Sequence, residues 1–328
     1  MLGYGRGVDD WQPDVLGEGF ESLTLPLEDD DEGPVVTTLV RYLSSTPEPV
    51  RAVRVVLYLH GWSDYFFQAE LARFWTSHAA AFYALDLRKH GRSLREHQTP
   101  NYTDNLDVYD EDLAAALDVI EDEHGPHARV LLMGHSTGGL IACLWADRFP
   151  GRVSSLVLNS PWLEMQGSAV VRAVSAPAIA QLARFQPKAA LPNIDPGWST
   201  RAIQEATGAE WSYDERWRPT PMFPVHPGWL NAIITGHATV ARGLSIDVPI
   251  LVAASDRSIM STTWSEEMRR ADVVIDVEAA VSRAVQLGPV VTVVRIAGGL
   301  HDLVLSARAP RRQFYAELDR WLAGYGWA

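Results

Sequence analysis

Residues 129–148 read RVLLMGHSTGGLIACLWADR: a short apolar run, then the pentapeptide Gly134-His135-Ser136-Thr137-Gly138, then an apolar helical pattern. A G-x-S-x-G pattern has a mechanical reason at a strand-to-helix junction, because the serine there adopts a strained backbone that only small neighbours accommodate. Such a turn lifts the hydroxyl out of the sheet, and the following helix directs N–H groups and the positive end of its dipole towards it. Ser136 is therefore the candidate nucleophile.

Short continuous apolar runs alternate with helical patterns on both sides of this stretch. Continuous runs are typical of strands covered on both faces, and helices between them indicate parallel βαβ units. Two β-rich runs, 19–27 and 35–45, flank the acidic loop 28–34, which we interpret as a solvated turn of an antiparallel pair. Further strands are expected at 53–59, 81–85, 129–133, 153–158, 248–253 and 290–296, and helices at 67–80, 108–124, 140–148, within 266–287 and at 311–322. The sequence predicts an α/β fold with a doubly wound, mostly parallel sheet.

The alternation is interrupted between Pro161 and Val248. Short helical patches such as 168–185 and 229–242 are separated there by prolines, and no strand pattern occurs. We expect a helical cap laid over the sheet after the sixth strand, rather than an independent domain. The predicted parts are a core over 1–161, a cap over 162–243 and a second core part over 244–328. Five of the twelve tryptophans belong to the cap or its edge, where we expect them to pack: Trp162, Trp198, Trp211, Trp217 and Trp229.

A serine hydroxyl needs a base to take its proton, and a carboxylate to orient that base. The base should lie on the loop after the last strand, and His301 is the only histidine beyond Val290. We assign it as the base.

The orienting carboxylate should follow the preceding strand. Asp256 comes directly after the run 248–253 and is our first choice. Asp272 and Asp276 are farther along the chain from that strand's carboxyl end, and Asp302 lies beside the base; these residues remain alternatives. Asp256 could instead cap the following helix.

The loop after the strand 53–59 begins His60-Gly61-Trp62, and its glycine allows the backbone to approach a substrate. We expect the main-chain N–H groups of Trp62 and Thr137 to form the oxyanion hole. The Trp62 side chain and His135 are the expected substrate contacts.

Composition and charge exclude several other classes of function. Apolar residues make up 47% and charged residues 21% of 328, which is ordinary for a folded globular protein. The net charge of −13 disfavours nucleic acid and stable membrane association as partners. The single cysteine, Cys143, cannot form an internal disulfide, and no H-E-x-x-H or C-x-x-C motif indicates a metal, so no cofactor is expected.

The cellular location and the source organism are inferred only from features that the sequence lacks. It shows no secretion signal at its start and no run of ~20 apolar residues that would span a bilayer, so we expect a cytoplasmic protein. Lys89 and Lys188 are the only lysines, a bias that we attribute to a GC-rich bacterial source.

These motifs resemble the α/β-hydrolase superfamily, and within it the monoacylglycerol lipase and lysophospholipase-like branch that includes serine aminopeptidase-like members. The resemblance is carried by His60-Gly61-Trp62, the run 85–93 (LDLRKHGRS, similar to the family's D-x-R-G-H-G-x-S), the pentapeptide around Ser136, and the chain order serine, Asp256, His301. Lys89 stands where the family usually has glycine, a departure that we interpret as structural. The resemblance implies a core with a helical lid, and hydrolysis of esters with medium to long acyl chains.

The expected function is therefore hydrolysis of a small acyl ester, such as a monoacylglycerol or a lysophospholipid-like ester, through an acyl-enzyme. Apolar residues in 168–185 would suit an interfacial lid, although a buried cap helix has the same pattern. The net charge favours soluble or micellar substrates over an anionic bilayer.

Two alternatives remain open. A non-catalytic binding module would be expected to lack a triad residue, whereas all three positions are filled here. An amide or peptide hydrolase would use the same triad and would need a cap carboxylate to hold a substrate amine; the candidates are Glu164, Asp195, Glu205, Glu210, Asp214 and Glu215.

Overall fold

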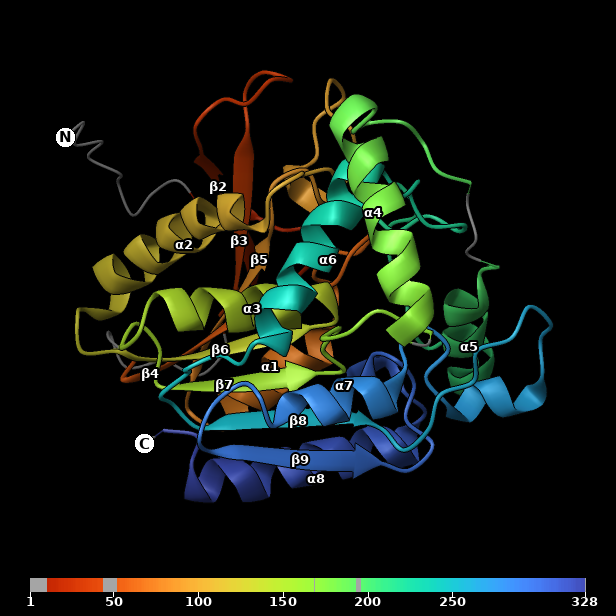
Figure 1. Ribbon diagram of the computed structural model, residues 1–328. Coiled ribbons are helices and arrows are strands. Elements are labelled where there is room, and N and C mark those ends of the chain that lie inside the picture. Colours follow the sequence, from red (N-terminus) through yellow and green to blue (C-terminus); the bar gives the residue numbers. More distant parts are fainter. Residues whose placement is uncertain (1–10, 44–51, 168, 193–195, 328) are drawn as a thin grey trace.

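The fold is built on one sheet of nine strands. The computed structural model describes residues 11–43, 52–167, 169–192 and 196–327. The strand order is β1-β2-β3-β5-β4-β6-β7-β8-β9 (Figure 1), antiparallel from β1 to β5 and parallel from β5 through β4 to β9. This confirms the predicted fold class. The strands are β1 (Gln12–Pro13), β2 (Phe20–Pro26), β3 (Val36–Tyr42), β4 (Arg54–Leu59), β5 (Ala81–Asp86), β6 (Arg129–His135), β7 (Ser155–Asn159), β8 (Ile250–Ser255) and β9 (Val291–Ile296).

Helices cover both faces of the sheet. One face carries α1 (Ala69–Ser77) and α8 (Arg308–Gly324). The other carries α2 (Tyr109–His124), α3 (Thr137–Arg148) and α7 (Val277–Ala284), which lie in front of the sheet in Figure 1. Short 3₁₀ turns occur at η1 (Gly91–Ser93), η2 (Leu106–Val108), η3 (Glu266–Arg270) and η4 (Leu303–Leu305).

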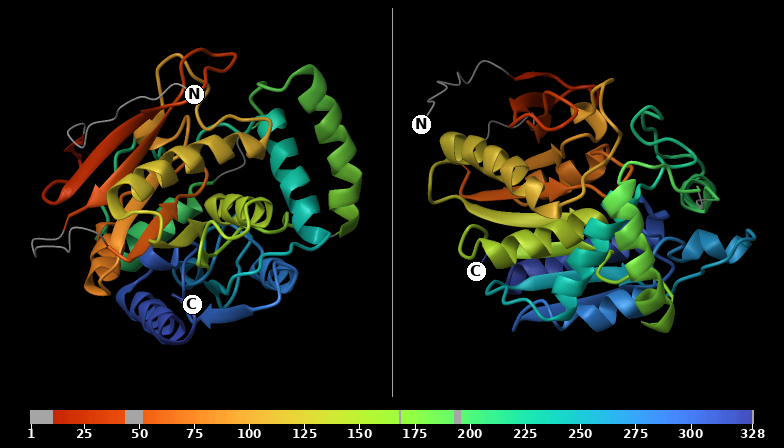
Figure 2. Two further views of the ribbon diagram at one scale, coloured as in Figure 1. Left: turned by 90° about the vertical axis from the view of Figure 1, so that its left-hand side faces the viewer. Right: turned by 45° about the horizontal axis from the view of Figure 1, so that its top comes forward.

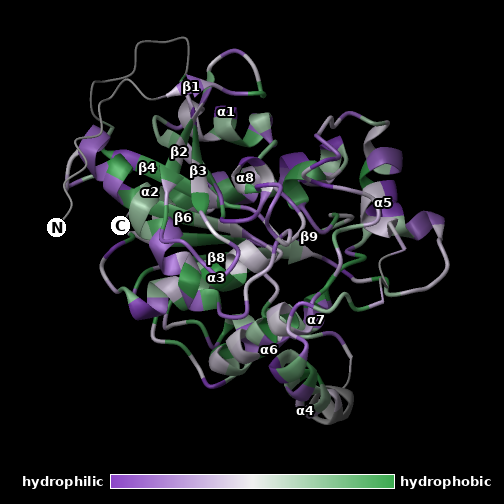
Figure 3. Ribbon diagram, turned by 90° about the horizontal axis from the view of Figure 1, so that it is seen from above, coloured by the Kyte–Doolittle hydropathy of each residue, from purple (hydrophilic) through white to green (hydrophobic). Residues whose placement is uncertain are grey.

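Strand β4 shows why the central runs are apolar without alternation. Val55, Leu57 and Leu59 belong to the core under α2 and α3, whereas Val56 and Tyr58 belong to the core under α1 and α8. All five side chains are fully buried. Two-sided burial removes the polar face that an exposed sheet would keep, and Figure 3 shows hydrophobic residues concentrated in the central strands.

Three helices lie between β7 and β8, where the sequence predicts the cap. They are α4 (Ala169–Phe185), α5 (Trp198–Thr207) and α6 (Pro227–Ala241). Figure 1 shows α4 and α5 on the side to which the arrowheads of β7 to β9 point. The insertion follows the seventh strand rather than the sixth, because the two-residue strand β1 was not predicted. We keep the name cap for residues 162–243, with the predicted bounds.

Helix α6 joins the cap to the core. It packs against α3, and Figure 2 shows α4 beside it. A Cβ added at Gly236 would lie 3.0–3.3 Å from Leu106, Leu140 and Leu144, so the glycine permits close packing of α6 on the core. Helix α4 lies farther out: among its described large apolar side chains, Leu182 and Phe185 are exposed, Phe185 by 73%. The side chains of Val170, Val171 and Val174 on this helix are not described.

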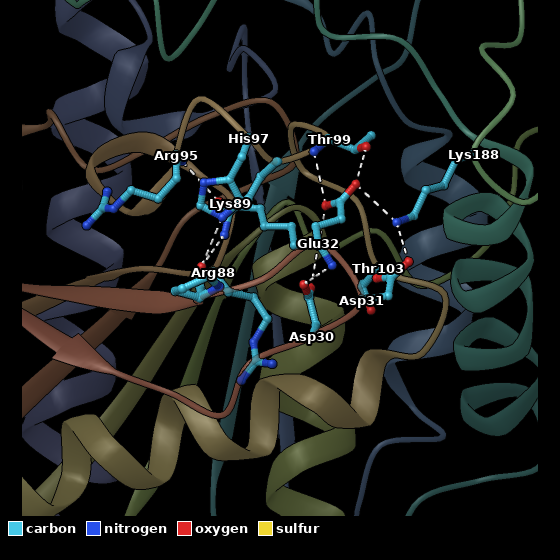
Figure 4. A network of polar contacts seen from close by, with 12 residues as sticks. Asp30, Asp31, Glu32, Arg88, Lys89, Arg95, His97, Thr99, Thr103 and Lys188 are labelled. Carbon is cyan, nitrogen blue, oxygen red and sulfur yellow. Dashed lines mark hydrogen bonds and ion pairs between the residues drawn. The ribbon is translucent and has the colours of Figure 1, made fainter.

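The acidic loop 28–34 differs from the solvated turn that its composition suggested. Its carboxylates hold both lysines of the chain (Figure 4). Lys89 is buried and pairs with Asp30 at 2.5 Å and Glu32 at 2.6 Å, and Lys188 of the cap pairs with Asp31 at 2.6 Å and Glu32 at 3.0 Å. The buried pairs explain the lysine in place of the family's glycine, although its φ of 62° is in the left-handed region that glycine favours.

We expect Lys89→Met to lower the free energy of unfolding by about 2–3 kcal/mol, because it leaves the partly buried Asp30 without its lysine and Glu32 with Lys188 alone. The methionine keeps the volume and the Cβ of the lysine. Lys188→Met is the matched control, with an expected loss below about 1 kcal/mol because Lys188 is more exposed. Denaturant unfolding of both variants at pH 7 measures this, and equal losses would contradict it.

Acid unfolding gives a second measure of the Lys89 pairs. Burial opposes the ionised form of Glu32, but hydrogen bonds from Lys89 and Thr99 outweigh it and lower its pKa to about 2. A lowered pKa in the folded state stabilises the fold above the ordinary carboxyl pKa, and that contribution is lost as the pH falls towards 2. We expect Lys89→Met to reduce the loss of stability between pH 5 and pH 2.

Candidate active site

Ser136 lies between β6 and α3, as the sequence predicts. Its φ of 53° and ψ of −118° are a strained conformation for a residue with a side chain. A Cβ added at Gly134 would lie 2.5 Å from the carbonyl oxygen of Gly138, and one added at Gly138 would lie 2.3 Å from that of His60. Both positions therefore require glycine, for the reason that the pentapeptide implied.

His301 lies on the loop between β9 and η4 and contacts the Ser136 side chain. Its Nε2 is 2.9 Å from Ser136 Oγ, and its Nδ1 is 2.8 Å from Asp272 Oδ2. An ionised carboxylate can only accept, so Nδ1–H donates to Asp272 and the neutral ring's Nε2 accepts from the serine hydroxyl. Asp272 is fully buried.

The carboxylate beside His301 is Asp272, so the assignment of Asp256 is wrong. After β8 the chain makes an excursion through η3 and returns to the end of the same strand. Asp272 N–H donates to the carbonyl of Arg257 at 3.0 Å, and Ser258 and Asp272 form an isolated parallel bridge. Asp272 is thus distant from β8 along the chain and adjacent to it in space, which the ranking by chain distance could not detect.

The other carboxylates have separate structural roles. Asp256 accepts the N–H of Gly298 at 3.0 Å, which holds the turn before His301. Asp276 caps the N-terminus of α7 through its Oδ1. Both belong to the framework around the site.

Asp302, the residue after His301, anchors this loop through hydrogen bonds. This buried carboxylate accepts from Asn159 Nδ2 at 2.7 Å and from Gln68 Nε2 at 3.1 Å. Asn159 also accepts the N–H of Leu303 at 3.2 Å. The sequence reasoning missed Gln68 and Asn159; the position of Asn159 at the end of β7 was the available signal.

The residues expected to form the oxyanion hole lie beside Ser136. We call residues 60–65 the oxyanion loop. A Cβ added at Gly61 would lie 3.2 Å from Ser136 Cβ, so this loop passes directly over the serine. Thr137 is the first residue of α3, where helix N–H groups have no acceptor within the helix. The donor roles of Trp62 and Thr137 stay predictions.

The two expected substrate contacts lie differently. His135 is buried, its ring 4.9 Å from that of His301, and burial lowers its pKa. The Trp62 ring is partly buried and packs 4.9 Å from that of Trp229 on α6. Contact of either residue with substrate stays a prediction.

The cap closes the site. Ser136 is 8% exposed and His301 is 9% exposed. The cavity beside His301 is about 10 Å³, roughly the space of one water molecule. Its lining includes Ser199, Ala202 and Ile203 of α5. Residues of α5, within the cap, therefore lie directly beside His301.

The site has a serine on a strand–turn–helix, a buried carboxylate later in the chain, and a histidine after the last strand. On a mostly parallel sheet, this arrangement defines an α/β-hydrolase. The chain belongs to the serine aminopeptidase S33 family, whose model matches residues 50–306. A curated relative, the monoacylglycerol lipase of Mycolicibacterium smegmatis, is 26% identical over 212 residues, which cover 62% of this chain and 69% of the relative.

Solved structures with the same fold include two named for this lipase activity. A Paleococcus ferrophilus monoacylglycerol lipase has a TM-score of 0.61 at 16% identity, covering 83% of this chain and 95% of its own. A soluble variant of monoglyceride lipase from Saccharomyces cerevisiae has a TM-score of 0.61 at 13% identity, covering 92% and 96%. A carboxyl esterase from Bacillus coagulans has a TM-score of 0.64 at 14% identity, covering 93% and 98%. The family match confirms the predicted branch of the α/β-hydrolases, and these solved structures share its fold.

Two further observations concern ligands and membranes. Within the described ranges, no three His, Cys, Asp or Glu side chains are grouped closely enough to hold a metal ion. No described helix is long and apolar enough to cross a bilayer.

Proposed function

We propose that this protein hydrolyses carboxylic esters of small acyl substrates through an acyl-enzyme on Ser136. The observation that carries the proposal is the connected chain of side chains: Ser136 Oγ lies 2.9 Å from His301 Nε2, and Nδ1 of that ring lies 2.8 Å from Asp272. These are hydrogen-bond distances suited to proton transfer from a nucleophile to its base.

The mechanism follows from the direction of these bonds. Ser136 Oγ bonds to the ester carbonyl carbon while its proton passes to His301 Nε2, and the carbonyl electron pair moves onto oxygen. The tetrahedral intermediate collapses, and His301 gives the proton to the departing alcohol. Water, deprotonated by His301, then adds to the acyl-enzyme, and Ser136 leaves with the proton as the acid is released. Asp272 keeps the hydrogen of the neutral His301 ring on Nδ1, and it stabilises the imidazolium that forms when Nε2 takes the proton.

The tetrahedral oxygen would be held by main-chain N–H groups of Trp62 and Thr137. Gly61 brings the oxyanion loop against Ser136, and the start of α3 directs N–H groups and the positive end of its dipole to the same place. Such donors stabilise the transition state more than the planar ester, so they raise kcat.

The cap carboxylates favour an ester over a peptide substrate. A serine aminopeptidase would need an uncompensated carboxylate to hold the substrate ammonium. Most of the described candidates already pair with arginine, which compensates their charge: Glu164 with Arg283, Glu205 with Arg201 and Arg269, Glu210 with Arg311, and Asp214 with Arg216. Glu215 is exposed, and Asp195 lies outside the described residues.

The lipid-like character of the substrate is supported by the surroundings of the site. Trp62, Trp162 and Trp229 form an aromatic cluster between the oxyanion loop and the cap. Helix α4 also exposes apolar side chains, which Leu182 and Phe185 exemplify. We infer a monoacylglycerol or related monoester, presented in solution or in micelles, as the substrate class.

Comparing an ester with an amide tests the choice of reaction. We expect kcat/KM for a monoacylglycerol to exceed that for an aminoacyl-naphthylamide by at least about a hundredfold, since arginines already compensate most of the described cap carboxylates that could bind the ammonium. The N-acetylated naphthylamide is the control, because an aminopeptidase requires the free amine. Efficient cleavage of the free but not the acetylated amide would instead establish the peptidase. Labelling of Ser136 by a fluorophosphonate would exclude a non-catalytic binding module.

A further inference from the structure

The oxyanion loop is bound by one stretch of the cap, residues 213–223, which we call the cap segment. Consecutive residues of the loop each bind a different residue of the segment. The contacts are Ser63 Oγ accepting the N–H of Phe223 at 3.1 Å, Asp64 Oδ1 with Arg218 Nε at 3.1 Å, and the Tyr65 hydroxyl accepting the N–H of Asp214 at 2.7 Å. The loop that would supply the Trp62 donor is therefore held from the cap side.

The ion pair at the centre of these contacts is buried. The side chains of Asp64 and Arg218 are 8% and 12% exposed. The guanidinium of Arg218 lies 4.8 Å from the ring of Tyr213 and 5.8 Å from that of Phe67. Its Nη1 and Asp64 Oδ1 are both buried without a hydrogen-bond partner in the described part of the chain, so the two side chains interact as charges and not through a hydrogen bond. Loss of one member of such a buried pair leaves the other charge uncompensated, unlike loss of a surface pair.

The position of Asp64 makes its charge relevant to the reaction. It lies two residues after Trp62, and its carboxylate interacts electrostatically with His135, the neighbour of Ser136. Burial raises the pKa of Asp64, and Arg218 opposes that rise. An uncompensated carboxylate on this loop would repel the negative charge that develops on the ester oxygen.

We propose that Arg218 is a positioning residue that couples closure of the cap to formation of the oxyanion hole. With the cap closed, Arg218 neutralises Asp64 and holds the oxyanion loop against Ser136. With the cap displaced, the loop loses its contacts with the cap segment and Asp64 is left unpaired. The site would then develop its full electrostatic stabilisation only in the closed state. This rests on the proposed ester hydrolysis.

The first test is Arg218→Met, which keeps much of the aliphatic stem and removes the charge. We expect kcat for a short p-nitrophenyl ester to fall by about 10- to 100-fold, within the effect of losing one oxyanion donor, while KM changes by less than about threefold. The Ki of a trifluoromethyl ketone, whose adduct oxygen occupies the oxyanion hole, should rise by the same factor as kcat/KM falls. A change in cap packing alone would raise KM instead.

The double variant Asp64→Asn with Arg218→Met separates electrostatics from packing. It removes the unpaired carboxylate, so we expect it to recover at least about threefold of the kcat lost in Arg218→Met. Arg218→Lys should also retain more activity than Arg218→Met. The matched control is Arg216→Gln, in the same segment but exposed, with unchanged kcat and KM.

These experiments distinguish failure of the coupling from failure of the proposed ester hydrolysis. A wild-type kcat in Arg218→Met, or a double variant as slow as the single, would overturn the coupling while leaving ester hydrolysis intact. A wild-type protein that cleaves no ester would overturn both. If circular dichroism shows Arg218→Met to be unfolded, Tyr65→Phe tests the same loop by removing only the hydroxyl that accepts from Asp214. We then expect kcat to fall about three- to tenfold at constant KM, and an unchanged kcat would refute the coupling.

Discussion

Ser136→Ala should reduce kcat on a short p-nitrophenyl ester by about 10⁴- to 10⁶-fold, because it removes the hydroxyl proposed to form the acyl-enzyme. Alanine keeps the Cβ of the serine, so the strained backbone at φ 53° is perturbed little and the fold should be retained. Initial rates measured together with a thermal unfolding curve separate loss of chemistry from loss of structure.

The control for this variant is Ser77→Ala at the end of α1, an exposed serine remote from the site. It should keep the wild-type rate. A Ser136→Ala protein that hydrolyses the ester as fast as the wild type would disprove the proposed mechanism, and retained fluorophosphonate labelling would place the nucleophile elsewhere.

Asp272→Asn should lower kcat by about 10³- to 10⁴-fold through the tautomer of His301. Asp272 Oδ1 accepts the N–H groups of Val274 and Ile275 at 2.7 and 2.9 Å. The asparagine carbonyl can keep those bonds, which turns its amide NH₂ towards His301 Nδ1. That nitrogen must then accept, so Nε2 carries the hydrogen and cannot take the proton of the serine.

Asp256→Asn is the matched control for this prediction. Its carbonyl oxygen can still accept the N–H of Gly298, so the turn before His301 is preserved. We expect kcat within about threefold of the wild type. Steady-state rates across pH 6–9 measure both variants, and a severe loss in Asp256→Asn with a mild one in Asp272→Asn would reverse the assignment.

The parts of the site that were predictable are those encoded within a few consecutive residues. Gly134, Ser136 and Gly138 stand together because a tight strand-to-helix turn needs them in that order. His301 was selected by its place after the last strand. Runs such as 53–59 predicted buried strands, because burial on both faces excludes polar residues from every position, not from alternate ones.

Two features depended on segments that meet only in the folded chain. The excursion after β8 brings Asp272 back beside Ser258, so its distance along the chain does not reflect its distance from His301. Lys89 likewise appeared as a departure from a motif, and its ion pairs with Asp30 and Glu32 come from a loop far earlier in the chain.

The sequence alone was sufficient for the fold class and for choosing Ser136 and His301, which the structure places in contact, since strand burial and the serine turn are enforced by local sterics and hydrophobic pattern. Only the tertiary structure placed Asp272 beside His301, brought α5 of the cap beside the site, and paired Asp64 with Arg218. These contacts join segments remote in sequence, and the Coulomb and desolvation energies that select the partner of a charged group depend on distances and burial that exist only after folding.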